Sequence, residues 1–314
     1  MCAYAAVPDW QREPRTGNEQ MYVMVPVRQE DLRLGYARID DSAVVVPEEM
    51  REQLIELIAE NQTRSEPKRK LQMTLFHQVS LAKEAEIGKP FTWRTSKVQQ
   101  LFLYLVQHRG KIVDKSTLID MLWPEYDPQK AYSQLYTAVY HIRRTLRPYE
   151  EHFSIRSISE GYMLELSHVE LDVEQFEQTV MECRNLTVEN VGRLEAVMEL
   201  YKGEYLSTFD YIWAEEERRR LFYLWYRTAD QLIKWYESKR EWGQALRLAL
   251  QLCDSSPLDE TAYLKVMQLY DKIGQRAFVR ATYKRLVQVL DFELQMTPGE
   301  EVEVWYRTWE MMNQ

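Results

Sequence analysis

The sequence predicts an α+β protein that is mainly α-helical, and three observations indicate this class. Residues 132–146 (YSQLYTAVYHIRRTL) show the three- to four-residue apolar spacing of a helix with one buried face. Short runs of alternating apolar and polar residues, typical of strands, precede this helix and recur around Gly161. From residue 169 onward the chain shows helical periodicity, broken only by short polar or proline-containing turns.

Length and composition indicate a globular protein of two or three domains. The chain has 314 residues, of which 45% are hydrophobic and 28% are charged, so it can bury substantial cores. It contains no run of about eighteen apolar residues, the length that a membrane-spanning helix needs. Residues 1–15 have neither the basic start nor the apolar stretch of a signal peptide. We therefore expect a cytoplasmic protein that does not associate with a membrane.

The residue types that build most catalytic and metal sites are scattered along the chain. Cys2, Cys183 and Cys253 lie far apart and form no CxxC pair, which argues against a disulfide framework or a zinc site. Ten glycines in 314 residues leave little material for a phosphate-binding loop. No nucleophile–base pair or cluster of metal ligands stands out. We expect no enzymatic activity, no cofactor and no bound metal.

The net charge of −9 is unevenly distributed along the chain. Residues 1–70 carry 10 basic and 13 acidic side chains, residues 71–167 carry 12 and 10, and residues 168–314 carry 18 and 26. The segment charges are therefore −3, +2 and −8, and only the middle segment is not acidic. Because exposed charges are screened over about 10 Å at moderate salt, a basic face there can attract nucleic acid despite acidic neighbours.

A small accessory module is predicted for residues 1–63, with a poorly ordered start. The runs MYVMVPV (21–27) and YARIDDSAVVV (36–46) are predicted as two strands, and Pro47 opens a helix with acids in its first turn. We expect a β-hairpin and helix that serve dimerisation or sensing. Residues 64–70 (RSEPKRK) are predicted to be a flexible basic linker.

Two short resemblances apply to this accessory module. YARIDDSAVVVPEEMREQL resembles the swapped-hairpin DNA-binding modules of the AbrB type. MVPVRQEDL equally resembles the last strand and helix of a response-regulator receiver, although the chain has no room for a whole receiver. The function of the module therefore stays open.

Residues 71–167 predict one domain that contains strands, three helices and a closing hairpin. Alternation over residues 71–93 indicates a small antiparallel sheet. Thr95 or Ser96 is expected to cap the first helix, which stops at Gly110. The second helix is expected to begin at Asp114 or Ser116, to carry Leu118, Leu122 and Trp123 inward and to end at Pro124. The third helix is residues 132–146, and residues 152–166 (HFSIRSISEGYMLEL) form the hairpin.

The outward side of the third helix carries aromatic, hydroxyl and guanidinium groups and no acid. Such groups can hydrogen-bond base edges and attract phosphates. A winged helix lays a third helix in the major groove and the neighbouring β-hairpin over the DNA backbone. An ordinary amphipathic helix with a solvated basic side gives the same pattern, and that alternative is open at this point.

Three stretches resemble the OmpR-type winged helix, in that family's order: GKIVDKSTLIDMLWPE, a basic third helix ending IRRTL, and RSISEGYMLEL. The family closes with an Arg, a turn, Gly-Tyr and a strand, which correspond here to Arg156, Gly161 and Tyr162. The resemblance implies that double-stranded promoter DNA is the partner. The residues expected in the groove are Ser133, Gln134, Tyr136, Thr137, Tyr140 and His141. Those expected at phosphates are Arg143 and Arg144, with Arg156 and Ser157 helping from the wing.

The chain departs from this family where basic residues are common. The middle of the third helix has Tyr140-His141, and the wing tip has Ser159-Glu160. We therefore expect little wing contact with the minor groove, and recognition by hydrogen bonds and by apolar contact with thymine methyl groups. Simpler roles are also open: ion pairs of the two arginines with Glu150 or Glu151, and core packing of Tyr136 and Tyr140.

Residues 168–314 predict a helical domain with a repeated helix pair. Ala245 and Ala277 lie 32 residues apart, each shortly after a small turn residue. This spacing is close to the tetratricopeptide period of about 34 residues, in which stacked pairs leave an extended surface for a protein partner. An irregular helical bundle is the alternative. The helices expected in the two pairs are 242–252, 257–274, 275–294 and 297–309.

The segments VELDVEQFEQTV, GEYLSTFDYIWAEEERRRL and LQMTPGEEVEVWYRTW resemble the bacterial transcriptional activation domain of the SARP (Streptomyces antibiotic regulatory protein) type. The two resemblances cover about residues 71–310, and their order makes them specific. Members of that family bind direct repeats upstream of a weak promoter and recruit RNA polymerase, so the resemblance implies an activator. The oligomeric state, including a homodimer, is open.

Two functional hypotheses follow. The first is a sequence-specific transcriptional activator that binds promoter repeats through the winged helix and contacts RNA polymerase or a signal through the helical domain. The second is a helical-repeat scaffold whose winged helix has lost DNA binding and grips protein instead. The Tyr140-His141 and Ser159-Glu160 positions are the best support for the second hypothesis.

Overall fold

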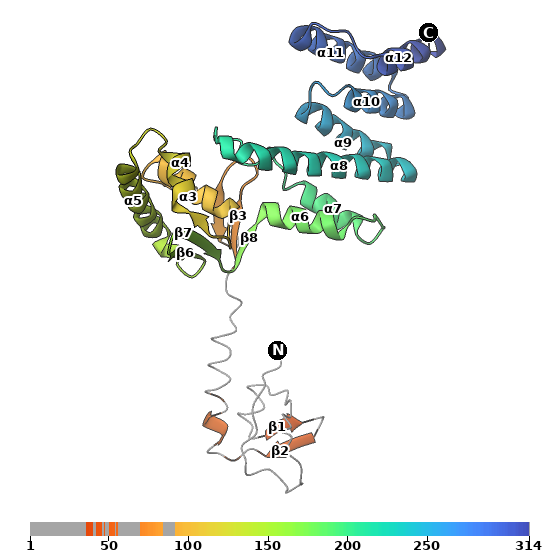
Figure 1. Cartoon of the computed structure of the whole chain (residues 1–314). Helices are drawn as coiled ribbons and strands as arrows, with labels where there is room; N and C mark the ends of the chain where they lie inside the picture. The colour runs from red at the N-terminus through yellow and green to blue at the C-terminus, as the bar shows by residue number, and fades with distance from the viewer. Residues whose placement is uncertain are drawn as a thin grey trace, which may run out of the picture. The chain divides into compact units, whose positions relative to one another are not determined.

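The computed structural model describes residues 36–39, 42–45, 47, 50–53, 55, 70–83 and 92–313. The chain divides into two units, residues 1–70 and residues 71–314. The described secondary structure is mainly helical, with three small sheets, which confirms the predicted fold class (Figure 1). None of the helices in the described ranges is both long enough and apolar enough to cross a lipid bilayer.

The first unit contains a hairpin where one strand was predicted. Strands β1 (Tyr36–Ile39) and β2 (Ser42–Val45) pair antiparallel. The prediction of a single strand over residues 36–46 is therefore wrong, and the Asp-Asp pair in the middle of the run is a turn signal that it passed over. Met50 and Arg51 donate their backbone N–H groups to the carbonyl of Pro47, as expected at a helix start. The strand predicted over residues 21–27 lies outside the described residues.

The second unit begins with a three-stranded sheet in the order β4-β3-β8. Strands β3 (Leu71–Thr74) and β4 (Ser80–Lys83) pair antiparallel, as predicted. Strand β8 (Val169–Leu171) joins β3 in parallel, so the prediction that the chain is helical from residue 169 is wrong for these three residues. Its hydrogen-bonding partner lies about a hundred residues earlier in the chain, and helical periodicity carries no information on such a pairing.

The winged-helix part follows the predicted order. The first helix is capped by Thr95, whose hydroxyl accepts the N–H of Val98 at 3.3 Å. The second starts after Asp114, whose side chain makes no capping bond, and it places Trp123 in the core. The elements are α3 (Ser96–Gln107), β5 (Val113–Asp114), α4 (Lys115–Leu122), α5 (Pro128–Leu146), β6 (Phe153–Ile158) and β7 (Gly161–Leu166). The sheet order is β5-β7-β6.

Helix α5 is the predicted third helix, but it begins at Pro128, four residues earlier than the apolar pattern indicated. Asp127 caps it, because its carboxylate accepts the N–H of Lys130 at 3.0 Å. Pro128 occupies the first helical turn, where a missing N–H costs nothing. The helix ends at Leu146, as predicted, and the chain continues into a short 3₁₀ turn, Arg147–Tyr149.

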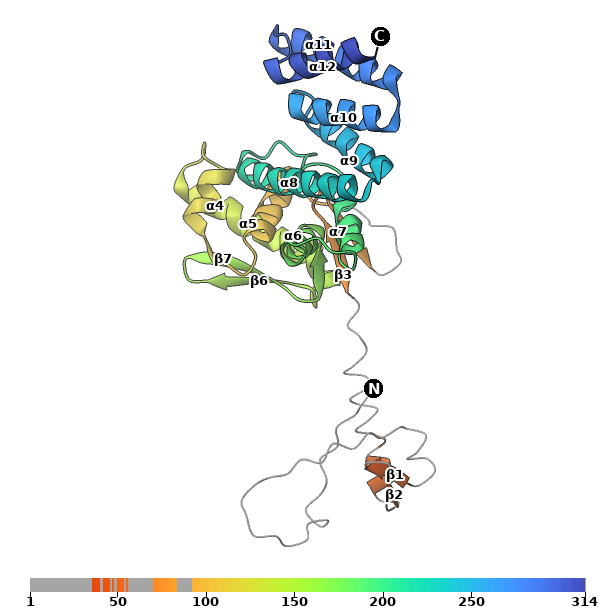
Figure 2. The same ribbon diagram turned by 90° about the vertical axis from the view of Figure 1, so that its right-hand side faces the viewer.

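The rest of the unit is a stack of helices. In both views α8 lies between the α6–α7 pair and α9, and α10, α11 and α12 follow beyond it (Figures 1 and 2). The helices are α6 (Asp172–Glu182), α7 (Val191–Met198), α8 (Glu215–Lys239), α9 (Trp242–Ser255), α10 (Glu260–Ile273), α11 (Arg276–Leu294) and α12 (Glu300–Met312). The four predicted repeat helices are α9 to α12. Arg240, Gly274 and Gln295 follow α8, α10 and α11 in the left-handed conformation that ends helices.

The winged helix and the helical stack share one continuous apolar core. The ring of Tyr104 on α3 packs edge-on against Trp213 with centroids 5.2 Å apart, and Trp213 stacks on Tyr211. Arg109, two residues after α3, pairs with Glu174 on α6 at 2.5 Å. These contacts hold the winged helix against the helices that follow it.

Candidate nucleic-acid interface

Helix α5 has one buried face and one open face, as its sequence predicts. Apolar side chains at helical spacing form the buried face and pack against α3 and α4. They are Ala131, Leu135, Ala138, Val139, Ile142 and Leu146. This packing fixes the rotation of the helix about its axis, so the remaining side chains point outward beside the β6–β7 hairpin.

The open side, hereafter the outer face of α5, carries all eight residues predicted on this helix: Ser133, Gln134, Tyr136, Thr137, Tyr140, His141, Arg143 and Arg144. Seven are exposed, and His141 is partly exposed. Tyr136 is 52% and Tyr140 is 59% exposed, so the alternative that these tyrosines complete the core is wrong. The helical stack does not cover the outer face, since these side chains stay open to solvent.

The hydroxyl groups on the outer face are bonded only to their own helix. Ser133 donates its hydroxyl proton to the carbonyl of Gln129 at 3.0 Å, and Thr137 donates to the carbonyl of Ser133 at 2.9 Å. Their oxygens keep lone pairs that can accept from the amino groups of cytosine or adenine. The side chain of Gln134 makes no hydrogen bond to any residue that the structure describes, so its donors and acceptor are both open.

The two arginines of α5 differ in what they contact. The guanidinium of Arg143 donates through Nη2 to the carbonyl of Ile155 at 2.8 Å and to the hydroxyl of Ser157 at 2.9 Å. It therefore fastens α5 to the wing strand β6. Arg144 has no ion pair or hydrogen bond with a described residue. Neither arginine pairs with Glu150 or Glu151, so that simpler alternative is wrong.

The surroundings of His141 favour its neutral form. Desolvation and the positive charges of Arg94 and Arg144 lower its pKa below the usual value of 6.5. At neutral pH the imidazole therefore carries one donor and one acceptor, so it can hydrogen-bond a base edge but does not attract phosphate as a cation.

The wing is a hairpin fastened to the start of α4. Gly161 lies so close to β5 that a Cβ there would approach the carbonyl oxygen of Val113 to 2.6 Å, which explains the glycine of the closing motif. Lys115 donates its backbone N–H to the carbonyl of Glu160 at 2.8 Å and its ammonium to the carbonyl of Ser159 at 2.6 Å. Lys115 thus anchors the exposed wing tip, which carries the acidic residue Glu160.

On the wing itself, Arg156 is exposed but pairs with Glu165 across the hairpin at 2.9 Å. Ser157 accepts from Arg143. The structure therefore brings the predicted residues together on one side of the domain, with Arg144 and Gln134 the most open and Arg156 and Ser157 already engaged.

Sequence reasoning missed two further basic residues. Lys130, in the first turn of α5, is exposed and lies over the ring of Tyr126 at 4.1 Å. The Asp-Pro start at residues 127–128 was the signal that the helix includes it. Arg94 precedes α3 and acts electrostatically on His141. No pattern in the sequence places Arg94 beside α5, because that proximity arises only from the packing of α3 on α5.

Two buried charged residues, Asp172 and Arg218, tie separate segments of the unit together, and their contacts are hereafter the junction. The carboxylate of Asp172 accepts the backbone N–H groups of Leu75, Phe76 and Val173 at 2.8–3.0 Å. Burial raises the pKa of Asp172 to about 6, although these hydrogen bonds oppose the rise. Arg218 on α8 donates to the carbonyls of Tyr205, Leu206 and Phe209 and pairs with Glu215.

The described residues hold no group of three or more His, Cys, Asp or Glu side chains placed to bind a metal ion. Cys183 and Cys253 are buried free thiols. His152 is buried and its ring contacts the carbonyl of Ser167. The chemistry that the interface offers is hydrogen bonding and charge, from an exposed helix face.

Comparison with protein families gives two matches. The family described as bacterial transcriptional activator domain matches residues 171–308, and the family described as transcriptional regulatory protein, C terminal, matches residues 88–164. The second range contains α3 to β6, the outer face of α5 and the first part of β7, and the first contains α6 to α11 with most of α12. No curated protein sequence matches the chain.

A solved structure with a similar fold is that of Mycobacterium tuberculosis EmbR in complex with a low-affinity phosphopeptide. The two share 18% sequence identity with a TM-score of 0.57. The alignment covers 76% of this chain and 64% of the EmbR chain, so this chain spans less than two thirds of that protein. The two family matches lie in the order that the sequence predicts, an OmpR-type winged helix and then an activator domain. The chain therefore belongs to the SARP-type bacterial transcriptional regulators.

Proposed function

We propose that this protein is a sequence-specific transcriptional activator, without enzymatic activity, that binds repeated promoter sequences through α5 and its wing. One observation carries the proposal. The outer face of α5 exposes hydroxyl, amide, imidazole and guanidinium groups beside a hairpin wing, and it contains no acid. This is the composition that base edges and phosphates require.

Each residue of the interface has a distinct role in this proposal. Gln134 reads base edges, since its amide is exposed and can pair bidentately with adenine. Arg144 and Lys130 bind phosphates. Arg143 sets the angle between helix and wing, because its guanidinium bridges α5 to Ile155 and can meet a phosphate only with its remaining N–H groups. Ser133, Tyr136, Thr137, Tyr140 and His141 supply the other groove contacts, and Arg156 and Ser157 stay at the margin.

The direct test is selection of bound duplexes from a random DNA pool with the full-length protein. We expect an enriched sequence that occurs twice, in direct repeat. Arg144→Ala should weaken binding to enriched and unrelated DNA alike, about threefold to tenfold, and reduce the slope of log affinity against log salt by about 1. Arg219→Ala on α8 is the matched control, because Arg219 is also exposed and its substitution should leave both quantities unchanged.

Activation is tested separately by transcription in vitro. A weak promoter preceded by the selected repeats should give more transcript with bacterial RNA polymerase when the protein is added. Repeats supplied in excess without a promoter should remove the effect by competition, because activation requires the protein to be bound at the repeats upstream of the promoter. Less transcript on addition would identify a repressor and contradict the activator proposal.

The second candidate is a protein-binding scaffold that does not bind DNA. The acidic residue at the wing tip, Glu160, and the engagement of Arg156 with Glu165 favour it, because they reduce the positive potential of the wing. A purified protein with no salt-dependent DNA affinity, and with partner binding that survives Arg143→Ala and Arg144→Ala, would establish the scaffold and exclude the activator.

A further inference from the structure

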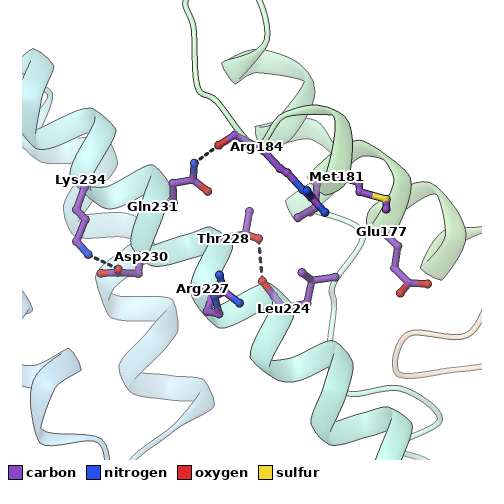
Figure 3. Close-up of a pocket in the computed structure, with 10 residues that line it drawn as sticks. Glu177, Met181, Arg184, Leu224, Arg227, Thr228, Asp230, Gln231 and Lys234 are labelled. Carbon is purple, nitrogen blue, oxygen red and sulfur yellow. Dashed lines mark hydrogen bonds and ion pairs between the residues drawn. The ribbon is translucent and has the colours of Figure 1, made fainter.

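A cavity of about 820 Å³ lies between α6 and α8, within the helical domain (Figure 3). This volume is in the range of small-molecule sites in proteins, about 300–1,000 Å³. Val180, Met181 and Leu224 supply apolar lining, and Met181 is 61% exposed although it is a large apolar side chain. The remaining lining residues are Glu177, Arg184, Arg227, Thr228, Asp230, Gln231 and Lys234.

Both carboxylates in the cavity contact cations other than Arg184 and Arg227. Glu177 accepts from Arg220 at 2.5 Å; Arg220 lies on α8 outside the lining and also pairs with Glu217 at 2.6 Å. Asp230 pairs with Lys234 one helical turn away at 2.6 Å. Counting Glu217 as well, the three acids and the four cations Arg220, Lys234, Arg184 and Arg227 leave one positive charge at the cavity.

The two guanidinium groups of the lining have no partner among the described residues. Arg184 follows α6 and Arg227 lies on α8, so they come from the two sides of the cavity (Figure 3). Neither side chain has an ion pair or hydrogen bond to any residue in the described ranges. Gln231 donates to the backbone carbonyl of Arg184 at 2.8 Å, which fixes the backbone at this position and leaves the guanidinium unengaged.

The two guanidinium groups lie in an acidic segment of the chain. Residues 168–314 carry 18 basic and 26 acidic side chains, so acids are in excess. Several exposed arginines of the segment pair with carboxylates, and examples are Arg193 with Glu182, Arg247 with Glu199 and Arg285 with Asp254. Two unpaired guanidinium groups that converge on one partly apolar cavity therefore indicate a binding site for an anion.

We propose that the cavity binds a small amphipathic anion. The ligand has a carboxylate, sulfonate or phosphate group, which Arg184 and Arg227 hold by charge-assisted hydrogen bonds. Its apolar body packs on Val180, Met181 and Leu224. The buried hydroxyl of Thr228 donates to the carbonyl of Leu224 at 2.7 Å, so the floor of the cavity offers an acceptor oxygen for one polar group of the ligand. The site does not depend on whether α5 binds DNA.

The experiment uses two fluorescent probes that differ by one anionic group. The first is 8-anilinonaphthalene-1-sulfonate, and the second is N-phenyl-1-naphthylamine, the same aromatic body without the sulfonate. Both are titrated into the full-length protein. We expect saturable binding of each, with the sulfonate bound about a hundredfold more tightly, because two charge-assisted contacts are each worth about tenfold.

Variants then assign the preference to the cavity. Arg227→Ala and Arg184→Ala should each weaken binding of the sulfonate about tenfold while leaving the neutral probe within about twofold. Arg219→Ala is the matched control, since it removes the same charge from an exposed site on α8 outside the cavity. Equal binding of both probes, equal loss of both, or a sulfonate affinity that no cavity variant changes would each overturn the proposal.

Discussion

Two groups of polar side chains in residues 71–314 contrast sharply: the outer face of α5 and the junction. On the outer face, Gln134 and Arg144 are exposed and unengaged within the described structure, and the hydroxyls of Ser133 and Thr137 bond only to their own helix. In the junction, Asp172 and Arg218 are each only 8% exposed, and both bond backbone groups of other elements.

The difference teaches that burial decides what a polar side chain does. A buried polar group must be hydrogen-bonded, because an unpaired one costs about 1–3 kcal/mol, so it contributes to folding. An exposed group without a protein partner carries no such requirement and is free to bind DNA. Substitutions at the junction should therefore change stability, and substitutions on the outer face should change DNA affinity.

The largest effect is expected at Arg218. Arg218→Ala would leave the carbonyls of Tyr205, Leu206 and Phe209 without their donor, and we expect a loss of about 3 kcal/mol in the free energy of unfolding. Urea unfolding followed by circular dichroism measures it. The adjacent exposed control Arg219→Ala should stay within about 0.5 kcal/mol of the unchanged chain. Equal stability of the two variants would break the comparison.

Asp172 gives the next largest effect, and it depends on pH. Its pKa of about 6 in the folded state lies above the usual 3.8, so the folded protein keeps a proton that the unfolded chain releases between these values. The stability that this group contributes is therefore present near pH 4 and is lost as pH rises through about 6.

Asp172→Asn removes this titration together with acceptor capacity for the N–H groups of Leu75 and Phe76. The variant should be less stable by about 2 kcal/mol near pH 4, and the difference should shrink towards pH 7. Urea unfolding across this range is the measurement. A difference that grows with pH would show that the hydrogen bonds, rather than burial, control the pKa of Asp172.

A substitution of Gln134 tests the outer face of α5, the exposed group of the comparison. Gln134→Ala should reduce the preference for the selected sequence at one base position about tenfold, while affinity for unrelated DNA stays nearly constant. Because the side chain makes no bond within the described structure, the free energy of unfolding should stay within about 0.5 kcal/mol. Binding to duplexes that vary at single positions measures the first quantity. A uniform loss over all sequences would assign Gln134 to phosphate.

The contrast also explains how much the sequence could predict. The buried face of α5 and the cap at Thr95 follow from local patterns, because helical spacing and capping involve residues a few positions apart. Exposure of the outer face followed directly from that spacing. Strand β8 and the bonds of Asp172 to Leu75 and Phe76 could not be predicted, since their partners lie nearly a hundred residues away in the chain.

The same reasoning applies within the predicted interface. The sequence correctly grouped Arg143 with Arg144 as neighbours on one helix face. It could not separate their roles, because the carbonyl of Ile155 reaches Arg143 only once the β6–β7 hairpin has packed beside α5. The family resemblance of the motifs, in their order, predicted a DNA-binding regulator, whereas the engagement of each side chain required the fold.

The smallest effect is expected for Arg156, which is exposed like the outer face of α5 but paired like the residues of the junction. It is 60% exposed, but its guanidinium is already paired with Glu165 at 2.9 Å. An exposed pair of this kind contributes about 0–1 kcal/mol to stability, so Arg156→Ala should barely change unfolding. It should also weaken DNA binding less than about twofold, because the cost of breaking the Arg156–Glu165 pair offsets part of any phosphate contact.

Glu165→Ala is the informative partner variant, since it frees Arg156 and should strengthen non-specific binding at low salt. If Arg156→Ala instead matches the loss in Arg144→Ala, the wing binds DNA as strongly as the helix does, and exposure outweighs engagement in setting the role of a side chain.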